Sequence, residues 1–418
     1  MSLSKPFNDV SAECPVAMKI AQKVADIPPS PHRKVVAIAE RKKREGKTVY
    51  NFSQGQPGLP PDSQALAAFA EMLLKHPFDL SKYSETKGLL QLRQELSADI
   101  KRYGSIDVGA DQFMITDGAV EGLNLSLTCL TKPGDKVLLF EPCYSVYWDL
   151  LQLHELKAVS VGERLEDGFQ PNPEEIKAAL NANVSAVILC SPDNPTSRII
   201  SRESVNVLLD GVVDRGIPLL YDEAYKHILY EGRHVWIHDH TGLADHLVSL
   251  NSFSKDLALP GFRLGYLFGP KDFVDEAAKL KAMTSICSPT PSQYLALAYF
   301  EGGRKEPYLK EVLPVYRKRR DTLYHAVATH LPLARAIEPQ AGMYLFPDLS
   351  AYLNQMLIND VDFSLKLAEE AEVITVPGSI SGPSGEGHLR MCFVGEDEAK
   401  LEAGVVKLFD YISKRNIA

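Results

Sequence analysis

The sequence predicts an α/β protein: a large domain with a mostly parallel sheet covered by helices, and a smaller α+β domain. Between about residues 90 and 270, short continuous apolar runs alternate with helical patterns, which is typical of strands buried on both faces. After about residue 275 this alternation stops. The chain has 418 residues, which is too long for one small core and indicates a second domain.

The elements of the large domain follow in order. We expect an arm or linker with a proline cluster over residues 1–35, and helical spacing follows over 33–47 and 92–103. A helix is also expected over 118–130, beginning at a glycine. Buried strands are expected over 113–116, 136–140, 184–190, 217–221, 247–250 and 264–268.

The smaller domain is predicted from the end of the chain. A long helical stretch covers roughly 304–330, and strand-like pieces follow over 342–346, 373–376 and 388–393. We therefore divide the chain into an N-terminal arm with part of the small domain (1–50), a large domain (51–300) and a small C-terminal domain (301–418).

Composition excludes several classes of protein. The formal net charge of −9 disfavours a nucleic-acid partner, which usually requires a basic face. No apolar run reaches the roughly 18–20 residues needed to cross a bilayer. Residues 1–19 are mixed polar with Asp9 and Glu13, so we do not expect a signal peptide. The six cysteines are scattered, without a CxxC pair, which favours buried free thiols. We expect a cytoplasmic protein.

The clearest chemical motif is the segment 251–266, NSFSKDLALPGFRLGY. Lys255 directly follows a predicted strand, at the end of a parallel sheet where ligands bind. A lysine amine can form a Schiff base with an aldehyde. The hydroxyl groups of Ser252 and Ser254 and the guanidinium of Arg263 suit a phosphate group. The alternative is an exposed loop lysine without function.

Three further motifs follow other predicted strands. Asp222 ends one strand and can hold a heterocyclic nitrogen protonated, or it can simply cap the next helix. Asn194 has an amide donor that could reach a phenolate oxygen, although Asn-Pro also favours a plain turn. Gly118 opens a helix whose first N–H groups form an anion site, or it belongs to an ordinary tight turn.

Taken in order, these motifs resemble the class I/II aminotransferases of the fold type I pyridoxal 5′-phosphate (PLP) enzymes, over about residue 28 to the end. The resemblance implies that Lys255 forms the Schiff base with PLP and moves the substrate proton. It implies that Asp222 pairs with the pyridine nitrogen, and that Asn194 and Tyr225 bind the 3′ oxygen of the ring. The residues that match the family's phosphate ligands are Gly118, Ala119, Val120, Ser252 and Arg263.

The same resemblance assigns the remaining site residues. Tyr144 matches the aromatic residue stacked on the pyridine ring, and Tyr83 matches a tyrosine that reaches the phosphate of the neighbouring subunit. Arg390 matches the arginine that clamps the substrate α-carboxylate, with Gly55 and Asn194 lining that site. A homodimer with shared active sites is therefore expected.

Two positions depart from the family's pattern. The motif usually written NPTG ends here in Ser197, which we expect to alter only the turn. The usual pair of glycines before the late aromatic residue is Ala341-Gly342, which is expected to tighten the substrate pocket. His234, His238 and His240 (HVWIHDH) suggest a metal site, but we favour a surface loop and expect no metal.

We therefore expect a PLP-dependent aminotransferase that moves the amino group of an L-amino acid to a 2-oxo acid. The alternatives are a PLP-dependent lyase, synthase or oxidase on the same fold, and a non-catalytic regulator, for which no DNA-binding segment is visible. Residues 282–292 (AMTSICSPTPS) contain no Arg or Lys, although family members that use dicarboxylic substrates often place a second arginine there. We expect a neutral or apolar side chain in the donor, unless another loop, such as the one carrying Arg33, supplies the charge.

Overall fold

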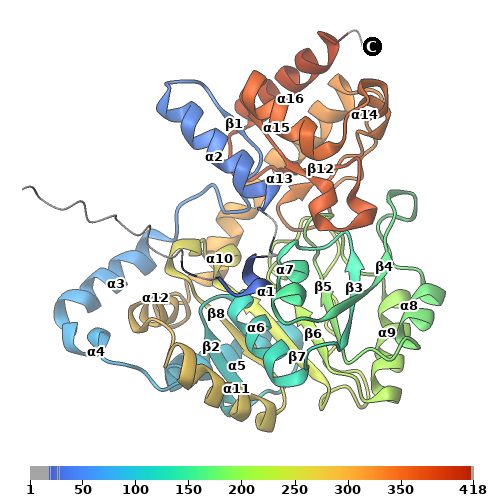
Figure 1. Cartoon of the computed structure of the whole chain (residues 1–418). Helices are drawn as coiled ribbons and strands as arrows, with labels where there is room; N and C mark the ends of the chain where they lie inside the picture. Colours follow the sequence, from blue (N-terminus) through green and yellow to red (C-terminus); the bar gives the residue numbers. More distant parts are fainter. Residues whose placement is uncertain (1–17, 19, 26, 28, 416–418) are drawn as a thin grey trace, which may run out of the picture.

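The computed structural model describes residues 18, 20–25, 27 and 29–415. Its centre is a seven-stranded sheet in the order β2-β8-β7-β6-β5-β3-β4 (Figure 1). Strands β3 to β7 are mutually parallel where they pair, and β8 is antiparallel to both β2 and β7. The bounds are β2 Phe113–Thr116, β3 Lys136–Glu141, β4 Lys157–Gly162, β5 Ala186–Cys190, β6 Leu219–Asp222, β7 Leu247–Ser252 and β8 Gly265–Phe268. The predicted fold class is confirmed.

Both faces of the sheet are buried, which explains the continuous apolar runs. In β5, Ile188 packs into the core under α6 (Ala119–Leu130), α7 (Val146–Leu153) and α11 (Lys271–Thr284). Val187 and Leu189 point to the opposite face, which α8 (Pro173–Leu180) and α9 (Arg202–Arg215) cover. Because successive side chains of a strand alternate between faces, each residue of such a strand must be apolar.

A second lobe combines the two ends of the chain (Figure 1). The helix α2 (Pro31–Arg44) packs against α15 (Asp360–Ala371), and β1 (Tyr50–Asn51) pairs in parallel with β10 (Val373–Ile374). In the three-stranded sheet, β12 (Leu389–Cys392) lies between β11 (Val376–Pro377) and β9 (Tyr344–Leu345). The helices α14 (Ser350–Met356) and α16 (Glu398–Ser413) complete this lobe.

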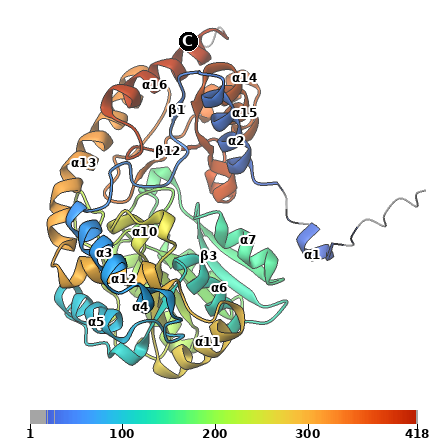
Figure 2. The ribbon, with the colours of Figure 1, turned by 90° about the vertical axis from the view of Figure 1, so that its left-hand side faces the viewer.

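The long helix α13 (Lys305–His330) runs along the side of the molecule from one lobe to the other (Figure 2). The other helices are α1 Gln22–Ala25, α3 Ser63–Lys75, α4 Pro77–Ser81, α5 Leu90–Gly104, α10 Phe253–Asp256 and α12 Thr290–Glu301. Short 3-10 helices cover Ala110–Gln112, Leu165–Asp167, Pro260–Phe262, Gly378–Ser381 and Pro383–Gly385.

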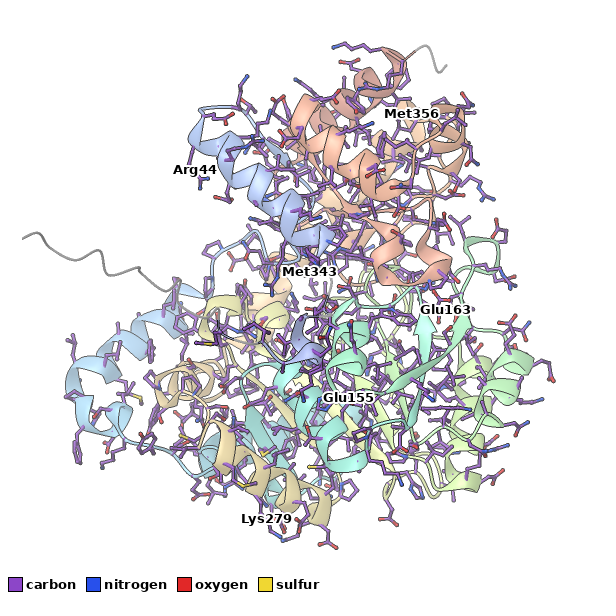
Figure 3. The ribbon with its side chains drawn as sticks, in the orientation of Figure 1. Arg44, Glu155, Glu163, Lys279, Met343 and Met356 are labelled. Atoms are coloured by element: carbon purple, nitrogen blue, oxygen red, sulfur yellow. The ribbon has the colours of Figure 1, made fainter. Side chains whose placement is uncertain are left out.

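Packing is continuous where the lobes meet. Met343 lies at this boundary, and Glu163 lies at the edge of the sheet below the smaller lobe (Figure 3). One hydrophobic cluster contains Phe52, Met343 and Cys392 of the smaller lobe together with Tyr225, which follows β6.

None of the helices in the described part of the chain combines the length and apolar character needed to cross a membrane.

Most predicted elements are present with shifted ends, but β4 was not predicted. It lies at the edge of the sheet, and several of its side chains are exposed. An edge strand therefore lacks the continuous apolar run by which the central strands were found.

Candidate active site

A cavity of about 660 Å³ lies at the carboxyl ends of the strands and is closed on one side by α2. All the predicted cofactor and substrate residues except Tyr83 line it, namely Gly55, Gly118, Ala119, Val120, Tyr144, Asn194, Asp222, Tyr225, Ser252, Lys255, Arg263 and Arg390. These residues come from segments that are far apart in the sequence. The order of the strands brings those of the large sheet to one edge, whereas Gly55 and Arg390 reach the cavity from the smaller lobe.

One end of the cavity is rich in hydrogen-bond donors. Gly118 is the N-cap of α6 and has φ +94°, and it lines the cavity together with Ala119 and Val120 of the first helical turn and with Arg263. Ser252 is the N-cap of α10, and its Oγ accepts a hydrogen bond from Ser254 N–H at 3.2 Å. A Cβ at Gly265 would lie 2.9 Å from the Gly118 backbone, which explains the second glycine of the Gly-x-Arg-x-Gly motif. Such an end suits a phosphate dianion.

A buried carboxylate also lines the cavity. Asp222 Oδ2 accepts a hydrogen bond from the Tyr147 hydroxyl at 2.7 Å, and its Oδ1 accepts one from Ala224 N–H at 3.1 Å. Burial raises the pKa of Asp222 to about 6, and the two hydrogen bonds act in the opposite direction. A cationic ring nitrogen placed beside this group would favour its charged form.

Lys255 lines the same cavity. Its Nζ donates a hydrogen bond to Gly55 O at 2.5 Å. Burial lowers the pKa of Lys255 to about 8, and the positive charges of Arg390 and Arg263 act in the same direction. The amine is therefore partly neutral near physiological pH, which is the form that attacks an aldehyde.

Arg390 reaches the cavity from β12. Its Nη1 donates to Asn194 Oδ1 at 3.1 Å and its Nη2 donates to Ser53 O at 3.2 Å. Its Nε–H is buried and has no hydrogen-bond partner among the described residues. Neutral acceptors hold this buried guanidinium in place, and its Nε–H is free to donate to a ligand. Such a guanidinium suits a carboxylate ligand.

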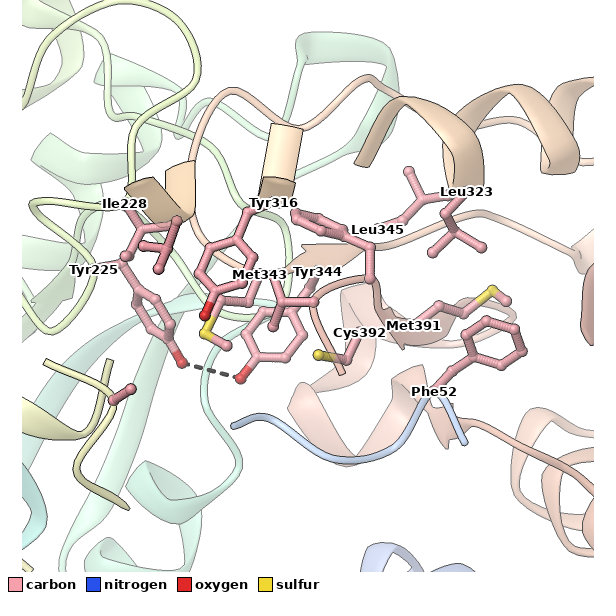
Figure 4. Packing of buried hydrophobic residues seen from close by; sticks show 14 of the residues in the cluster. Phe52, Tyr225, Ile228, Tyr316, Leu323, Met343, Tyr344, Leu345, Met391 and Cys392 are labelled. Carbon is pink, nitrogen blue, oxygen red and sulfur yellow. Dashed lines mark hydrogen bonds between the residues drawn. The ribbon is translucent and has the colours of Figure 1, made fainter. Parts of the chain in front are cut away.

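The hydroxyl groups of Tyr225 and Tyr344 lie 3.0 Å apart (Figure 4). Tyr225 follows β6, whereas Tyr344 belongs to β9 of the smaller lobe. The Arg390 guanidinium lies over the Tyr344 ring, 4.6 Å from its centre.

Sequence reasoning missed several residues of the cavity. Tyr147 and Tyr344 are the most important, because each bonds to a predicted cofactor residue. Tyr147 lies three residues after Tyr144, and this spacing was the only available signal. Arg33 and Asp149 also line the cavity. The positive charge that the N-terminal segment was thought able to supply is therefore present at the site.

Two sequence interpretations need correction. His234 and His238 do not lie in a surface loop: both side chains are buried beside Glu223, with His234 Nε2 2.7 Å from Glu223 Oε1. Among the described residues, no group of His, Cys, Asp and Glu side chains is arranged to hold a metal ion.

The second correction concerns the cysteines, which were expected to be buried free thiols. The described cysteines are free, and Cys143, Cys190 and Cys392 are buried, but Cys129 is exposed. Cys14 lies outside the described residues.

The chain is similar in sequence and in fold to known aminotransferases. The sequence profile described as aminotransferase class I and II matches residues 47–408. An aspartate aminotransferase of Sulfurisphaera tokodaii is 28% identical over 375 residues, covering 88% of this chain and 91% of the relative. Aromatic-amino-acid aminotransferase 2 of Thermococcus litoralis is 26% identical over 403 residues, covering 96% and 100%. The solved aspartate aminotransferase of Thermotoga maritima has a TM-score of 0.85 at 26% identity, covering 94% of this chain and 100% of that one.

The fold and the cavity define a PLP enzyme that transfers amino groups. The chain belongs to the class I and II aminotransferase family, and it is a PLP-dependent aminotransferase that acts on amino acids and 2-oxo acids. The residues present fit the cofactor. The donor-rich part of the cavity suits its phosphate, the Asp222 carboxylate suits its ring nitrogen, and the Lys255 amine lines the same cavity.

Proposed function

We propose that the residues lining the cavity divide the work of transamination as follows. Bound PLP supplies an aldehyde carbon for the substrate amine and a ring that accepts electrons when a bond at Cα breaks. Gly118, Ala119, Val120, Ser252 and Arg263 hold the phosphate, Asp222 keeps the ring nitrogen protonated, Asn194 and Tyr225 donate to the 3′ oxygen, and Tyr144 covers the ring.

Arg390 binds the α-carboxylate of the substrate, with Asn194 and Gly55 beside it. This places the substrate Cα next to Lys255. The Lys255 amine, whose pKa burial lowers to about 8, accepts the Cα proton and later donates it. A general base with a pKa near the working pH suits both steps. The presence of Lys255, Asp222 and Arg390 in one cavity is the observation that carries this assignment.

We further propose that the donor is an L-amino acid with a neutral or apolar side chain. The lining of the cavity includes the apolar side chains of Val36, Ala37 and Val146. Arg33 would attract a distal carboxylate, but Asp149 lines the same cavity and would repel it. Burial raises the pKa of Asp149, and the Arg33 charge acts in the opposite direction. The two charges together therefore favour a side chain without net charge.

A homodimer with shared sites is part of the same proposal. Tyr83 is 79% exposed and does not line the cavity of its own chain. Nearby in the chain, Leu74 and Phe78 are also exposed, and residues 82–84 hydrogen-bond to α12. Exposed apolar side chains that lie together are typical of an interface. We also propose a cytoplasmic location, and a division into a large domain (51–300) and a small one (1–50 with 301–418).

A single-turnover experiment tests the reaction type. The holoenzyme is mixed with one amino acid in the absence of any 2-oxo acid acceptor. An aminotransferase releases one 2-oxo acid per active site and then stops until an acceptor is added. A lyase or an oxidase would continue to turn over and would release ammonia, and that result would overturn the proposal.

A further inference from the structure

Tyr344 connects two parts of the site that come from different lobes. Its hydroxyl lies 3.0 Å from that of Tyr225, and both side chains are buried (Figure 4). Its ring lies under the Arg390 guanidinium. A Cβ at Gly55 would collide with the Tyr344 hydroxyl, so the glycine leaves the space that this hydroxyl occupies.

The backbone fixes Tyr344 in this position. Tyr344 pairs with Cys392 in the antiparallel β9–β12 ladder. Cys392 lies two residues after Arg390 on the same strand. Its N–H donates to Ser197 Oγ at 3.2 Å. The aromatic ring therefore has little freedom to turn away from Tyr225, and the contact between the two hydroxyls is built into the fold.

The direction of the hydrogen bond follows from what Tyr225 must do. A phenol has one proton. If Tyr225 donates that proton to the cofactor, its oxygen can only accept from Tyr344. Burial raises the pKa of Tyr344 to about 12, so its hydroxyl keeps the proton at neutral pH and remains a donor.

We propose that Tyr344 is a positioning residue that acts through Tyr225: its hydroxyl donates to the Tyr225 oxygen and strengthens the hydrogen bond that Tyr225 gives to the ring 3′ oxygen. This inference rests on the proposed role of Tyr225. Hydrogen bonds arranged in a chain polarise one another, so a donor behind Tyr225 makes Tyr225 a better donor.

The consequence is electrostatic. A donor at the 3′ oxygen withdraws negative charge from it, so the nitrogen that links Lys255 to the cofactor holds its proton less tightly. The pH at which the visible absorbance of the holoenzyme changes reports this proton directly and does not depend on turnover. Loss of the Tyr344 hydroxyl should therefore move this pH upward.

The experiment titrates the absorbance of four variant holoenzymes beside the wild type. Tyr344→Phe should raise the midpoint by about 0.3 to 1 pH unit, as expected for weakening one neutral hydrogen bond. Tyr225→Phe should raise it further, and the double variant should match Tyr225→Phe alone, because the effect of Tyr344 passes through Tyr225. Tyr316→Phe is the matched control: Tyr316 is a buried tyrosine of the same cluster that does not line the cavity, and its midpoint should equal that of the wild type.

The outcomes separate the two assignments. If Tyr225→Phe moves the midpoint and Tyr344→Phe does not, the inference about Tyr344 is wrong and the role of Tyr225 stands. If Tyr225→Phe itself has no effect, the role proposed for Tyr225 fails first. If Tyr344→Phe weakens binding of phenylpropionate, a simple carboxylate probe, while the midpoint is unchanged, the hydroxyl is a substrate ligand and the inference is overturned. Thermal melting of each holoenzyme checks that the variants are folded.

Discussion

The Tyr147 hydroxyl donates a hydrogen bond of 2.7 Å to Asp222 Oδ2. Tyr147 is buried in α7, and its ring meets the Tyr144 ring edge to face at 5.7 Å. One side chain thus supports both the carboxylate proposed for the ring nitrogen and the aromatic residue proposed to cover the ring. Since Asp222 Oδ1 accepts from Ala224 N–H, the carboxylate both forms a local turn and lines the site.

The first prediction concerns Tyr147→Phe. The hydrogen bond from Tyr147 lowers the pKa of Asp222 against the effect of burial, so its loss should leave Asp222 less charged at pH 7. We expect kcat and cofactor affinity to fall by roughly 10- to 100-fold, as expected for the loss of one hydrogen bond to a charged group. Tyr221→Phe is the control, because that buried hydroxyl donates to Val235 O, away from the cavity. Equal kinetics for the two variants would contradict the prediction.

The second prediction concerns Asp222→Asn. Loss of the preorganised charge should lower kcat by roughly 10² to 10⁴; a loss of less than tenfold would reduce Asp222 to a turn residue. Without cofactor, in contrast, the Asp222→Asn variant should be more stable than the wild type. The pKa of Asp222 is about 6 in the folded chain and about 3.9 when unfolded, so this group makes stability fall as pH rises from 4 to 6. The variant should therefore melt above the wild type at pH 7.5, with a smaller difference at pH 4.

The third prediction concerns Lys255. Burial lowers its pKa to about 8, and only the neutral amine attacks an aldehyde. The rate at which the cofactor-free enzyme binds PLP should rise with pH and reach half its maximum near pH 8, as followed by absorbance in stopped flow. Lys255→Ala should not turn over, and borohydride should no longer fix PLP to the chain. A midpoint above pH 10 would show that the lysine is not desolvated.

The fourth prediction concerns the donor. We expect kcat/KM for methionine and phenylalanine to exceed the values for aspartate and glutamate. Asp149→Asn removes the charge that repels a distal carboxylate, so it should raise kcat/KM for glutamate relative to methionine. Arg33→Gln should lower that ratio. An aspartate value tenfold above the neutral donors in the wild type would mean that the charge balance between Arg33 and Asp149 does not set the preference.

The fifth prediction concerns assembly. Sedimentation should show a dimer at assay concentration, and Tyr83→Phe should weaken PLP binding although Tyr83 is exposed in its own chain. Tyr50→Phe is a comparison, since Tyr50 lies in β1, outside the cavity, and should bind PLP normally. A fully active monomer would refute the shared site.

The apolar runs of the sequence, and the polar residues that follow them, were enough to predict the parallel sheet and the residues at its edge. Buried strands must be apolar on both faces, and the residues after parallel strands must meet, so Asp222, Asn194 and Lys255 could be brought together without coordinates. The resemblance to a family added Arg390 and Gly55, which no periodicity would have linked to that edge.

Tertiary structure alone decided the contacts between segments that no motif connects. Tyr147, Tyr344, Arg33 and Asp149 enter the cavity because α7, β9 and α2 pack around it, and the buried positions of His234 and His238 depend on Glu223 beside them. The residue type alone does not show whether a hydroxyl or a charged group faces water or lies 2.7 Å from a carboxylate. Its partner, and so its pKa and its role, is set by long-range packing.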